Sequence, residues 1–173
     1  MFEEDIHNHH LEQLNQLRIY IDHLEFESRI IQKSEQIPIN ILLAAITVDY
    51  KERNRFINFS FVPISGEELD HINLLQFYTT LPIDLNNNAR ESLEKLIFVI
   101  NTRMAIGHFG LQEDGEIYLR YIYTTHRVHG INEQQIVETM MLYTAMLDMH
   151  ERLLDRVAIG EMSLQEALRE LEE

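Results

Sequence analysis

Histidine has the widest chemical range of the side chains in this sequence, because it can bind a metal or act as a general base near neutral pH. Nine histidines occur, among them a cluster in HNHH at residues 7–10 and a pair in HRVH at residues 126–129. A zinc site needs three or four converging ligands, and no recognised metal-binding spacing is present. We therefore expect no metal and no cofactor. We expect His7, His9 and His10 to be exposed. We expect His108 and His150 to be half-buried beside hydrogen-bond partners.

The other chemical signatures are weak as well. The glycines of GHFG at residues 107–110 precede a strand, whereas a phosphate-binding loop feeds the N-terminus of a helix. The chain has no cysteine, which excludes thiol catalysis and disulfides. It also has no G-x-S-x-G and no H-E-x-x-H. We expect a protein that is not an enzyme. The alternative is a small-molecule-binding or enzymatic domain, with a pocket between the sheet and the long C-terminal helix lined by His108, His150, Tyr121 or Arg120.

The charge balance narrows the class of partner. Lys and Arg number 14, Asp and Glu number 29, and the formal net charge is −15. Such a balance argues against binding to nucleic acid or to an anionic membrane, where cationic side chains supply the affinity. No apolar run reaches the ~18 residues of a membrane span, and MFEEDIHNHH does not resemble a secretory signal. We expect a cytoplasmic protein that meets basic or apolar protein partners.

Helical periodicity defines the elements that must position these residues. Leucine and isoleucine recur at steps of three and four in residues 5–24, which predicts a first helix. A middle helix follows Asn87 or Asn88 as its cap, and a long helix runs from Asn132 to a stop at Gly160. SLQE at residues 163–166 is typical of a capping box for a last short helix.

Several β-rich segments lie between the helices. IPINILLAAITVDYKERNRFINFSFVPIS predicts a hairpin whose arms are joined by the polar DYKERN. EFESRIIQKSEQ is ambiguous and fits a short edge strand, and INLLQFYTTLPI fits a strand or a short helix. The order of elements predicts an α+β fold with a mainly antiparallel sheet. We expect one domain over residues 1–160, with residues 161–173 as a short helix appended to it.

The stretch IGHFGLQEDGEIYLRY predicts a further hairpin, because Asp114-Gly115 is a strong turn signal. A loop of two or four residues places Phe109 and Leu111 on one face with Tyr118 and Ile122. His108, Leu119 and Tyr121 then share the other face, and both faces are apolar. One face can pack on the long helix, whereas the other needs cover from the first helix, a second subunit, or a bound ligand or peptide.

These faces supply the expected interaction surface. The middle helix is apolar on more than one side, because Phe98 and Val99 flank its apolar stripe. We expect a protein partner, or a second copy in a homodimer, to bind an apolar surface of sheet and helix. Its candidate residues are Leu93, Ile97, Phe98, Ile100, Phe109, Leu111, Tyr118 and Ile122.

The run from LEKLIFVINTRM through the hairpin to the long helix, about 80 residues, resembles the YbjN-like proteins. The similar features are a helix ending in Ile100-Asn101, then Gly107 and Phe109, the Asp114-Gly115 turn, and a strand with Tyr118 and Arg120 that leads to the long helix. The resemblance implies helices packed on a curved antiparallel sheet, the fold of type III secretion chaperones. It implies no catalytic residues. It also implies a regulatory or chaperone-like role in which an extended protein segment is bound, often by a dimer.

Overall fold

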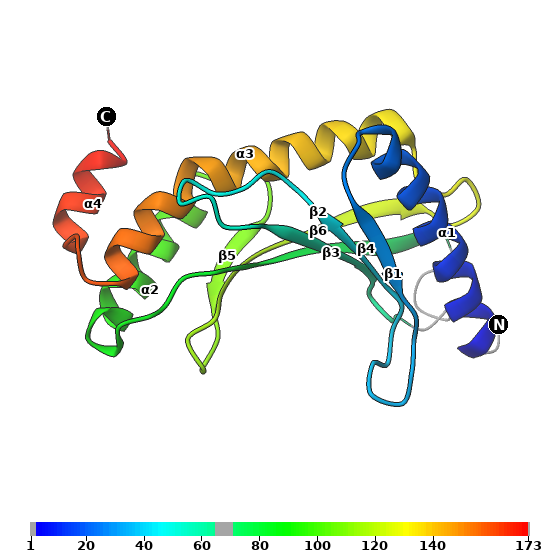
Figure 1. Ribbon diagram of the computed structural model, residues 1–173, viewed down its shortest axis with the longest axis horizontal. Coiled ribbons are helices and arrows are strands. Elements are labelled where there is room, and N and C mark those ends of the chain that lie inside the picture. The colour runs from blue at the N-terminus through cyan, green and yellow to red at the C-terminus, as the bar shows by residue number, and fades with distance from the viewer. Residues whose placement is uncertain (1–2, 65–70, 173) are drawn as a thin grey trace. The chain divides into compact units, whose positions relative to one another are not determined.

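The computed structural model describes residues 3–64 and 71–172, and these form four α-helices, one 3₁₀ helix and six strands (Figure 1). The helices are α1 (Glu3–His23), η1 (Asn87–Ala89), α2 (Arg90–Asn101), α3 (Glu133–Ala158) and α4 (Leu164–Glu170). The strands are β1 (Ser28–Ile31), β2 (Ile41–Ala45), β3 (Phe56–Phe61), β4 (Ile72–Leu81), β5 (His108–Leu111) and β6 (Ile117–His126). They form one sheet in the order β1-β2-β3-β4-β6-β5. The predicted α+β fold with a curved, mainly antiparallel sheet is confirmed.

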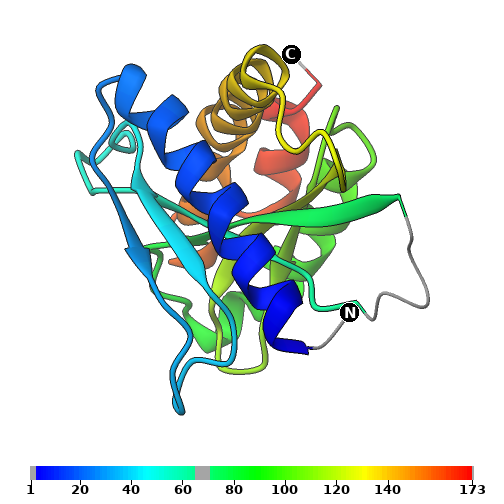
Figure 2. The same ribbon diagram turned by 90° about the vertical axis from the view of Figure 1, so that its right-hand side faces the viewer.

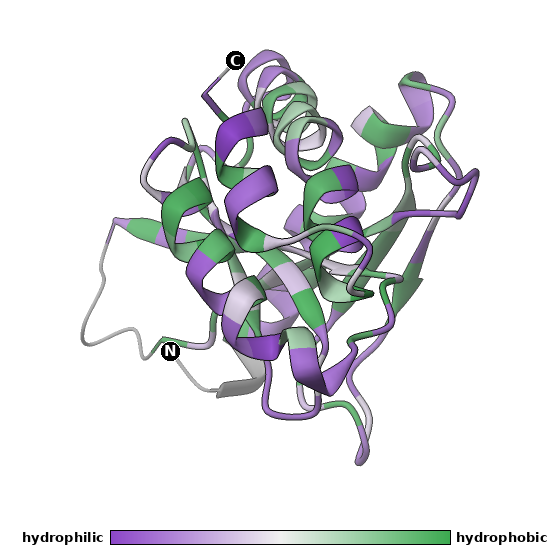
Figure 3. Ribbon diagram, turned by 90° about the vertical axis from the view of Figure 1, so that its left-hand side faces the viewer, coloured by the Kyte–Doolittle hydropathy of each residue, from purple (hydrophilic) through white to green (hydrophobic). Residues whose placement is uncertain are grey.

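The helices follow the apolar periodicity of the sequence. Along α3, every residue of the predicted row is buried, and Gly160 ends the helix with a φ of 81°. The row consists of Ile136, Met140, Tyr143, Leu147, His150, Leu154 and Val157. In α4, Ser163 and Glu166 complete the predicted capping box. Figure 3 shows hydrophilic and hydrophobic residues alternating around the helical turns, as expected for helices with one buried side.

The start of the middle helix differs from the prediction. Asn86 is the N-cap of η1, and its side-chain oxygen accepts a hydrogen bond from the backbone N–H of Asn88. Helix α2 follows η1 directly, and its own N-cap is Ala89, which forms no side-chain capping hydrogen bond. The expected caps, Asn87 and Asn88, were therefore wrong. Three consecutive asparagines have the same capping propensity, so the choice among them depends on where the preceding chain enters the helix.

The chain divides into two compact units, each assembled from three separate segments. Unit 1 comprises Met1–Ile46, Phe56–Tyr78 and Tyr121–Met141. Unit 2 comprises Thr47–Arg55, Thr79–Arg120 and Leu142–Glu173. The expected single domain over residues 1–160, with residues 161–173 appended, stays a prediction.

In unit 1, α1 packs on one face of β1, β2 and β3, as Figure 2 shows for the blue helix beside the lighter blue strands. The buried side chains of this face come from both layers: Leu14, Leu17, Ile21, Leu42, Ala44, Ile57, Phe59 and Phe77. The strands alternate, so that Leu43, Asn58 and Tyr78 point to the opposite face, where they are half-buried. We call this opposite side the outer face of unit 1.

In unit 2, the hairpin β5–β6 packs against α2 and α3. Phe109, Ile117 and Leu119 are buried on the helix side of the hairpin, and the Tyr143 hydroxyl donates to the Leu119 carbonyl oxygen at 2.8 Å. Helix α2 lies beside both β5 and α4, and it contributes four buried apolar side chains. These are Leu93, Leu96, Ile97 and Ile100.

The register of this hairpin corrects the predicted faces. Phe109 pairs with Leu119, Gly110 with Tyr118 and Leu111 with Ile117, so the loop is Gln112–Glu116 and contains five residues. Loops of two and four residues give the same faces as each other, but an odd loop shifts the register by one and reverses them. Phe109 therefore lies on the face opposite Tyr118, and the expected grouping of Phe109 and Leu111 with Tyr118 and Ile122 was wrong.

Candidate functional site

The residues of the expected interaction surface separate into a buried and an accessible group. Leu93, Ile97, Ile100 and Phe109 are at most 7% exposed and belong to the core of unit 2. Phe98, on the opposite side of α2, is 71% exposed. Leu111, Tyr118 and Ile122 are half-buried. The buried four are corrected from surface to core, because the amphipathic stripe of α2 faces its own unit; whether the accessible four bind a partner stays a prediction.

The hairpin glycines serve packing and turns. A Cβ on Gly110 would lie 2.2 Å from Cζ of Tyr118, so the tyrosine ring lies directly over the glycine on the neighbouring strand. Gly107 has a φ of 70° and Gly115 a φ of 99°, backbone conformations that glycine adopts readily. Within GHFG, Gly110 thus allows a close aromatic contact, and Gly107 supplies a positive φ directly before β5.

The histidines occupy environments that the sequence predicts only in part. His10 was expected to be exposed, but it is buried and stacked on Phe61 with ring centroids 4.5 Å apart. Burial, together with the neighbouring His9, lowers the pKa of His10 to about 4. His7 and His9 are half-buried, so they too were wrongly expected to be exposed. Their positions on α1 turn them partly towards their own unit.

His108, in the hairpin, and His150, in α3, do not contact each other. His108 is exposed and pairs across the strands with Arg120, where it was expected to be half-buried beside Leu119 and Tyr121. His150 is buried on the helix side, edge-on to Phe109 at 6.0 Å between ring centroids, and no described residue bonds its Nδ1. Burial lowers the pKa of His150. The two side chains therefore line no common pocket, because the hairpin lies between them.

Tyr121 and Arg120 are the other two residues expected to line a pocket between the sheet and the long C-terminal helix. The ring of Tyr121 contacts Phe77 in unit 1, with centroids 5.7 Å apart. Arg120 is on the face opposite Leu119 in unit 2. Within the described residues, no group of three or more His, Asp or Glu side chains is arranged to hold a metal ion.

An ion-pair network in unit 2 is the feature that the sequence analysis missed. Arg55 is 2% exposed and lies in the connection between β2 and β3. Its guanidinium donates to Glu151 at 3.0 Å, to Asp148 at 2.7 Å, and to the carbonyl oxygens of Thr47 and Val48. Each of these contacts joins the connection to itself or to α3.

A third carboxylate of α3 extends the network. Asp155 accepts hydrogen bonds from Tyr50 at 2.6 Å and Arg53 at 2.9 Å, and forms an ion pair with Lys51 at 2.7 Å. Arg53 also bonds Asp49 and the carbonyl oxygen of Pro82. The polar turn DYKERN is thereby fixed against the C-terminal half of α3.

The carboxylates of the network titrate differently. Burial raises the pKa of Asp49 and Asp155, but hydrogen bonds from Arg53 to the first and from Lys51 and Tyr50 to the second outweigh it, and both pKa values end below the ordinary range. Burial raises the pKa of Glu151, and Arg55 offsets only part of that effect. All these groups have charged or polar partners, which indicates that they hold the connection in place.

The sequence did contain a signal for this network. Asp148, Glu151 and Asp155 are spaced by three and four residues, which places three acids on one side of a helix. Three cationic residues, Lys51, Arg53 and Arg55, occupy every second position of a short segment. Matching these two charge patterns would have predicted their contact.

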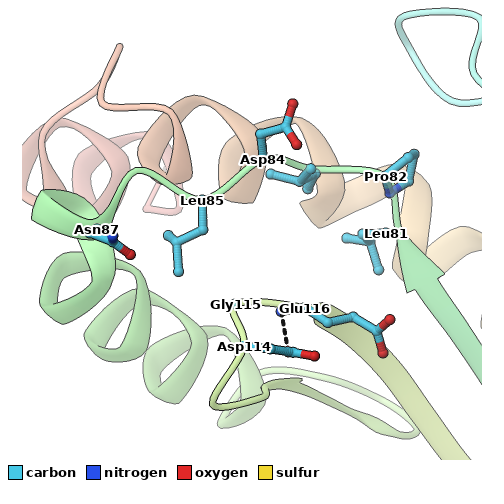
Figure 4. Close-up of a pocket in the computed structure, with 9 residues that line it drawn as sticks. Leu81, Pro82, Asp84, Leu85, Asn87, Asp114, Gly115 and Glu116 are labelled. Carbon is cyan, nitrogen blue, oxygen red and sulfur yellow. Dashed lines mark hydrogen bonds between the residues drawn. The ribbon is translucent and has the colours of Figure 1, made fainter.

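Two open cavities accompany these features. In unit 2, a cavity of about 370 Å³ lies between the β4–η1 connection and the hairpin turn (Figure 4). Leu81 and Leu85 point into it, whereas the Asp84 carboxylate points away, and Asp114 accepts the backbone N–H of Glu116 at 3.0 Å. In unit 1, a cavity of about 680 Å³ is lined by His7, Asn8, Leu11, Gln32, Lys33, Ser34, Glu35 and Asn40.

Neither of these two cavities gathers a catalytic constellation. In the described ranges, no helix is long and apolar enough to cross a membrane. A search of curated proteins found no match. The model of the YbjN family, described as "Putative bacterial sensory transduction regulator", matches residues 47–156, more than half of the chain. That description names a regulator and no reaction. The chain therefore belongs to the YbjN family.

Proposed function

We propose that this protein is a non-enzymatic regulator that binds a segment of another protein through an apolar surface of its sheet. The observation that carries the proposal is the outer face of unit 1. There, apolar side chains are half-buried or exposed on strands whose other face packs on α1: Ile41, Leu43, Ala45, Phe56, Leu74 and Tyr78. A sheet face that meets only water normally carries polar residues, and a larger apolar patch is typical of an interaction site.

Two further observations support this role. The description of the family names sensory transduction regulation, which requires a molecule that meets other molecules. The net charge of −15 favours partners with basic residues around an apolar contact. The exposed Phe98 on α2, with Leu111, Tyr118 and Ile122, adds accessible apolar side chains.

Site-specific photocross-linking in cells tests the proposal. A benzophenone amino acid at Leu43, on the outer face, should give a covalent adduct with a distinct protein. The matched control is Ile19, an apolar residue of α1 that is 49% exposed. Phe56→Lys, 40% exposed in the native chain, should lower the adduct yield at Leu43 and leave the melting temperature unchanged.

A second copy of the chain is the other candidate occupant of this face. Sedimentation at several concentrations separates the two cases, because a homodimer dissociates on dilution while a complex with another protein needs that protein. The proposal fails if Leu43 gives no more adduct than Ile19 and the purified protein stays monomeric.

A further inference from the structure

The sheet ends in two edge strands, and an edge strand presents backbone N–H and C=O groups that can pair with another chain. In an antiparallel pair, alternate residues direct both groups either towards the partner strand or away from it. The register of each edge strand therefore shows which groups point outward. The outward groups differ between β5, in unit 2, and β1, in unit 1.

The β5 edge is blocked at its centre. Gln112 N–H bonds Glu116 O, so even-numbered residues of β5 pair with β6 and the backbone of Phe109 points outward. The Asn101 side chain donates to Phe109 O at 2.9 Å and accepts from Phe109 N–H at 2.8 Å. One amide at the end of α2 thus occupies both outward groups of Phe109.

The β1 edge has no such cover. Ala45 N–H bonds Glu27 O at 2.8 Å, so odd-numbered residues pair with β2, and Ser28 and Ile30 direct their backbone groups outward. No residue in 3–64 or 71–172 forms a hydrogen bond with the backbone of Ser28 or Ile30 on that side. These groups are spaced as a β-strand requires, and only another extended backbone matches all of them.

Helix α1 packs on one face of β1 and follows this edge strand. Near the start of β1, Ser28 Oγ donates to Asp22 at 3.0 Å. Just past its end, the Asn40 side chain accepts from Lys33 N–H and donates to the carbonyl oxygen of His7. Helix and strand therefore run antiparallel along the whole of β1, as Figure 2 shows. Asp22, Arg18, Leu11 and His7 are spaced by four, seven and four residues, so they share the flank of α1 that borders the strand.

A cavity lies beyond one end of the β1 edge. The cavity of about 680 Å³ lies between the residues that follow β1 and the first turns of α1. Its lining is mainly polar, from His7, Asn8, Lys33 and Glu35. Ile30 on β1 and Leu11 on α1 are half-buried and provide apolar contact. A chain added at this edge would thus lie beside apolar side chains and end at a polar cavity.

We propose that β1 is the docking edge, where an extended, net positively charged segment of a partner protein adds as a further strand beside α1. Side chains that face α1 alternate along the added strand and are apolar next to Ile30. The positive charge matches the chain's net charge of −15. Strand addition of this kind gains affinity from main-chain hydrogen bonds and specificity from alternate side chains. This inference rests on the proposed function and names the mode of binding.

Proline substitution tests the edge selectively. Ile30→Pro removes an outward N–H and no hydrogen bond of the β1–β2 ladder, and edge strands tolerate proline. Ser28→Pro does the same at the neighbouring outward position. Ile30→Val is the matched control, because it keeps the N–H and nearly the same side chain. Circular dichroism melting checks that each variant folds like the native chain.

The probe is a display library of random twelve-residue peptides, selected against the full chain. We expect selected peptides with alternating apolar residues and net positive charge. Their affinity should fall about threefold to tenfold for Ile30→Pro and for Ser28→Pro, as for the loss of a hydrogen bond, and stay unchanged for Ile30→Val. Hydrogen exchange at the Ser28 and Ile30 amides should slow when peptide is bound.

The alternative results separate this inference from the proposed function. If peptides bind both proline variants as well as the native chain, or leave the two amides unprotected, the docking edge is wrong while segment binding stands. If no peptide is selected but Leu43 still forms its protein adduct, the docking edge is again wrong. If peptides and adduct are both absent, the proposed function fails as well.

Discussion

The guanidinium of Arg55 illustrates how strongly single residues hold this structure. It is buried between Glu151 and Asp148 and bonds two backbone carbonyl oxygens of its own segment. A buried charge without a partner is costly because the low-dielectric interior replaces water poorly. The connection between β2 and β3 therefore depends on a matched set of charges.

Arg55→Met should lower the free energy of unfolding by about 3–5 kcal/mol, because it leaves Glu151 buried without its cation. Urea unfolding at pH 7 measures the change. The double variant Arg55→Met/Glu151→Leu should recover most of the loss, since it removes both charges. A loss below about 1 kcal/mol for the single variant would contradict the role of the pair.

His10 should make stability depend on pH. Its pKa is about 4 in the folded chain and near 6.5 when unfolded, so folding favours the neutral ring. This contribution is fully present above pH 6.5 and is lost as the pH falls towards 4. We expect a loss of about 2 kcal/mol, less than the whole shift implies because nearby solvent screens the charge.

The measurement is urea unfolding at several pH values for the native chain and for His10→Phe. Phenylalanine keeps an aromatic ring against Phe61 and does not titrate. Between pH 6.5 and pH 4, the native chain should lose about 2 kcal/mol of its free energy of unfolding relative to His10→Phe. Outside this range, the difference between the two proteins should stay constant. Parallel pH profiles would show that His10 is not the group responsible.

At the level of elements, the periodic patterns were the most informative part of the sequence. The apolar row of α3 and the capping box of α4 follow from local spacing, and both are present. The faces of the β5–β6 hairpin were wrong, because they depend on whether Gln112–Glu116 closes as an even or an odd loop. The Arg55 network and the Asn101 contact were missed, because each joins residues that only the fold brings together.

Asn101→Ala should lower the free energy of unfolding by about 1–3 kcal/mol, because it leaves both outward groups of Phe109 without partners. It should also promote self-association through the opened β5 edge. Urea unfolding and sedimentation measure the two effects. Asn101→Asp keeps an acceptor for the Phe109 N–H and should lose less stability than alanine; equal losses would argue against the edge contact.

Gly110→Ala should displace the ring of Tyr118, since the new Cβ would lie within 2.2 Å of it. We expect a loss of about 1–2 kcal/mol, because half-buried aromatic packing is disturbed at a flexible ring end. A double-mutant cycle with Tyr118→Ser measures the coupling. The two substitutions should be clearly non-additive; additive effects would show that the ring does not rest on the glycine.

At the scale of the whole molecule, the family match begins where the chain first leaves unit 1, and it includes parts of both units. The chain leaves unit 1 after Ile46, passes through unit 2 and returns to unit 1 at Phe56. The family match begins at residue 47, just after β2 ends at Ala45. The matched residues therefore include β3 and its partner β4 but exclude β2, the other strand that pairs with β3.

A fragment of residues 47–156 should not fold as a stable monomer. Without β2, the backbone groups of Ile57 and Phe59 that now pair with Ala44 and Leu42 become a new edge, and their buried side chains are uncovered. Size-exclusion chromatography and circular dichroism should show aggregation or loss of a cooperative transition, with the full chain as control. A monomeric fragment that unfolds cooperatively would refute this expectation.

The position of β1 and α1 outside residues 47–156 has a consequence for how such proteins diverge. The charges that fix the connection to α3, from Asp49 to Asp155, lie within the match. The β1 edge proposed above for docking lies before it. On that proposal, substitutions in residues 3–31 change which segment binds while the ion-pair network stays intact. Two members of the family can then share the network and differ in the segment that they bind.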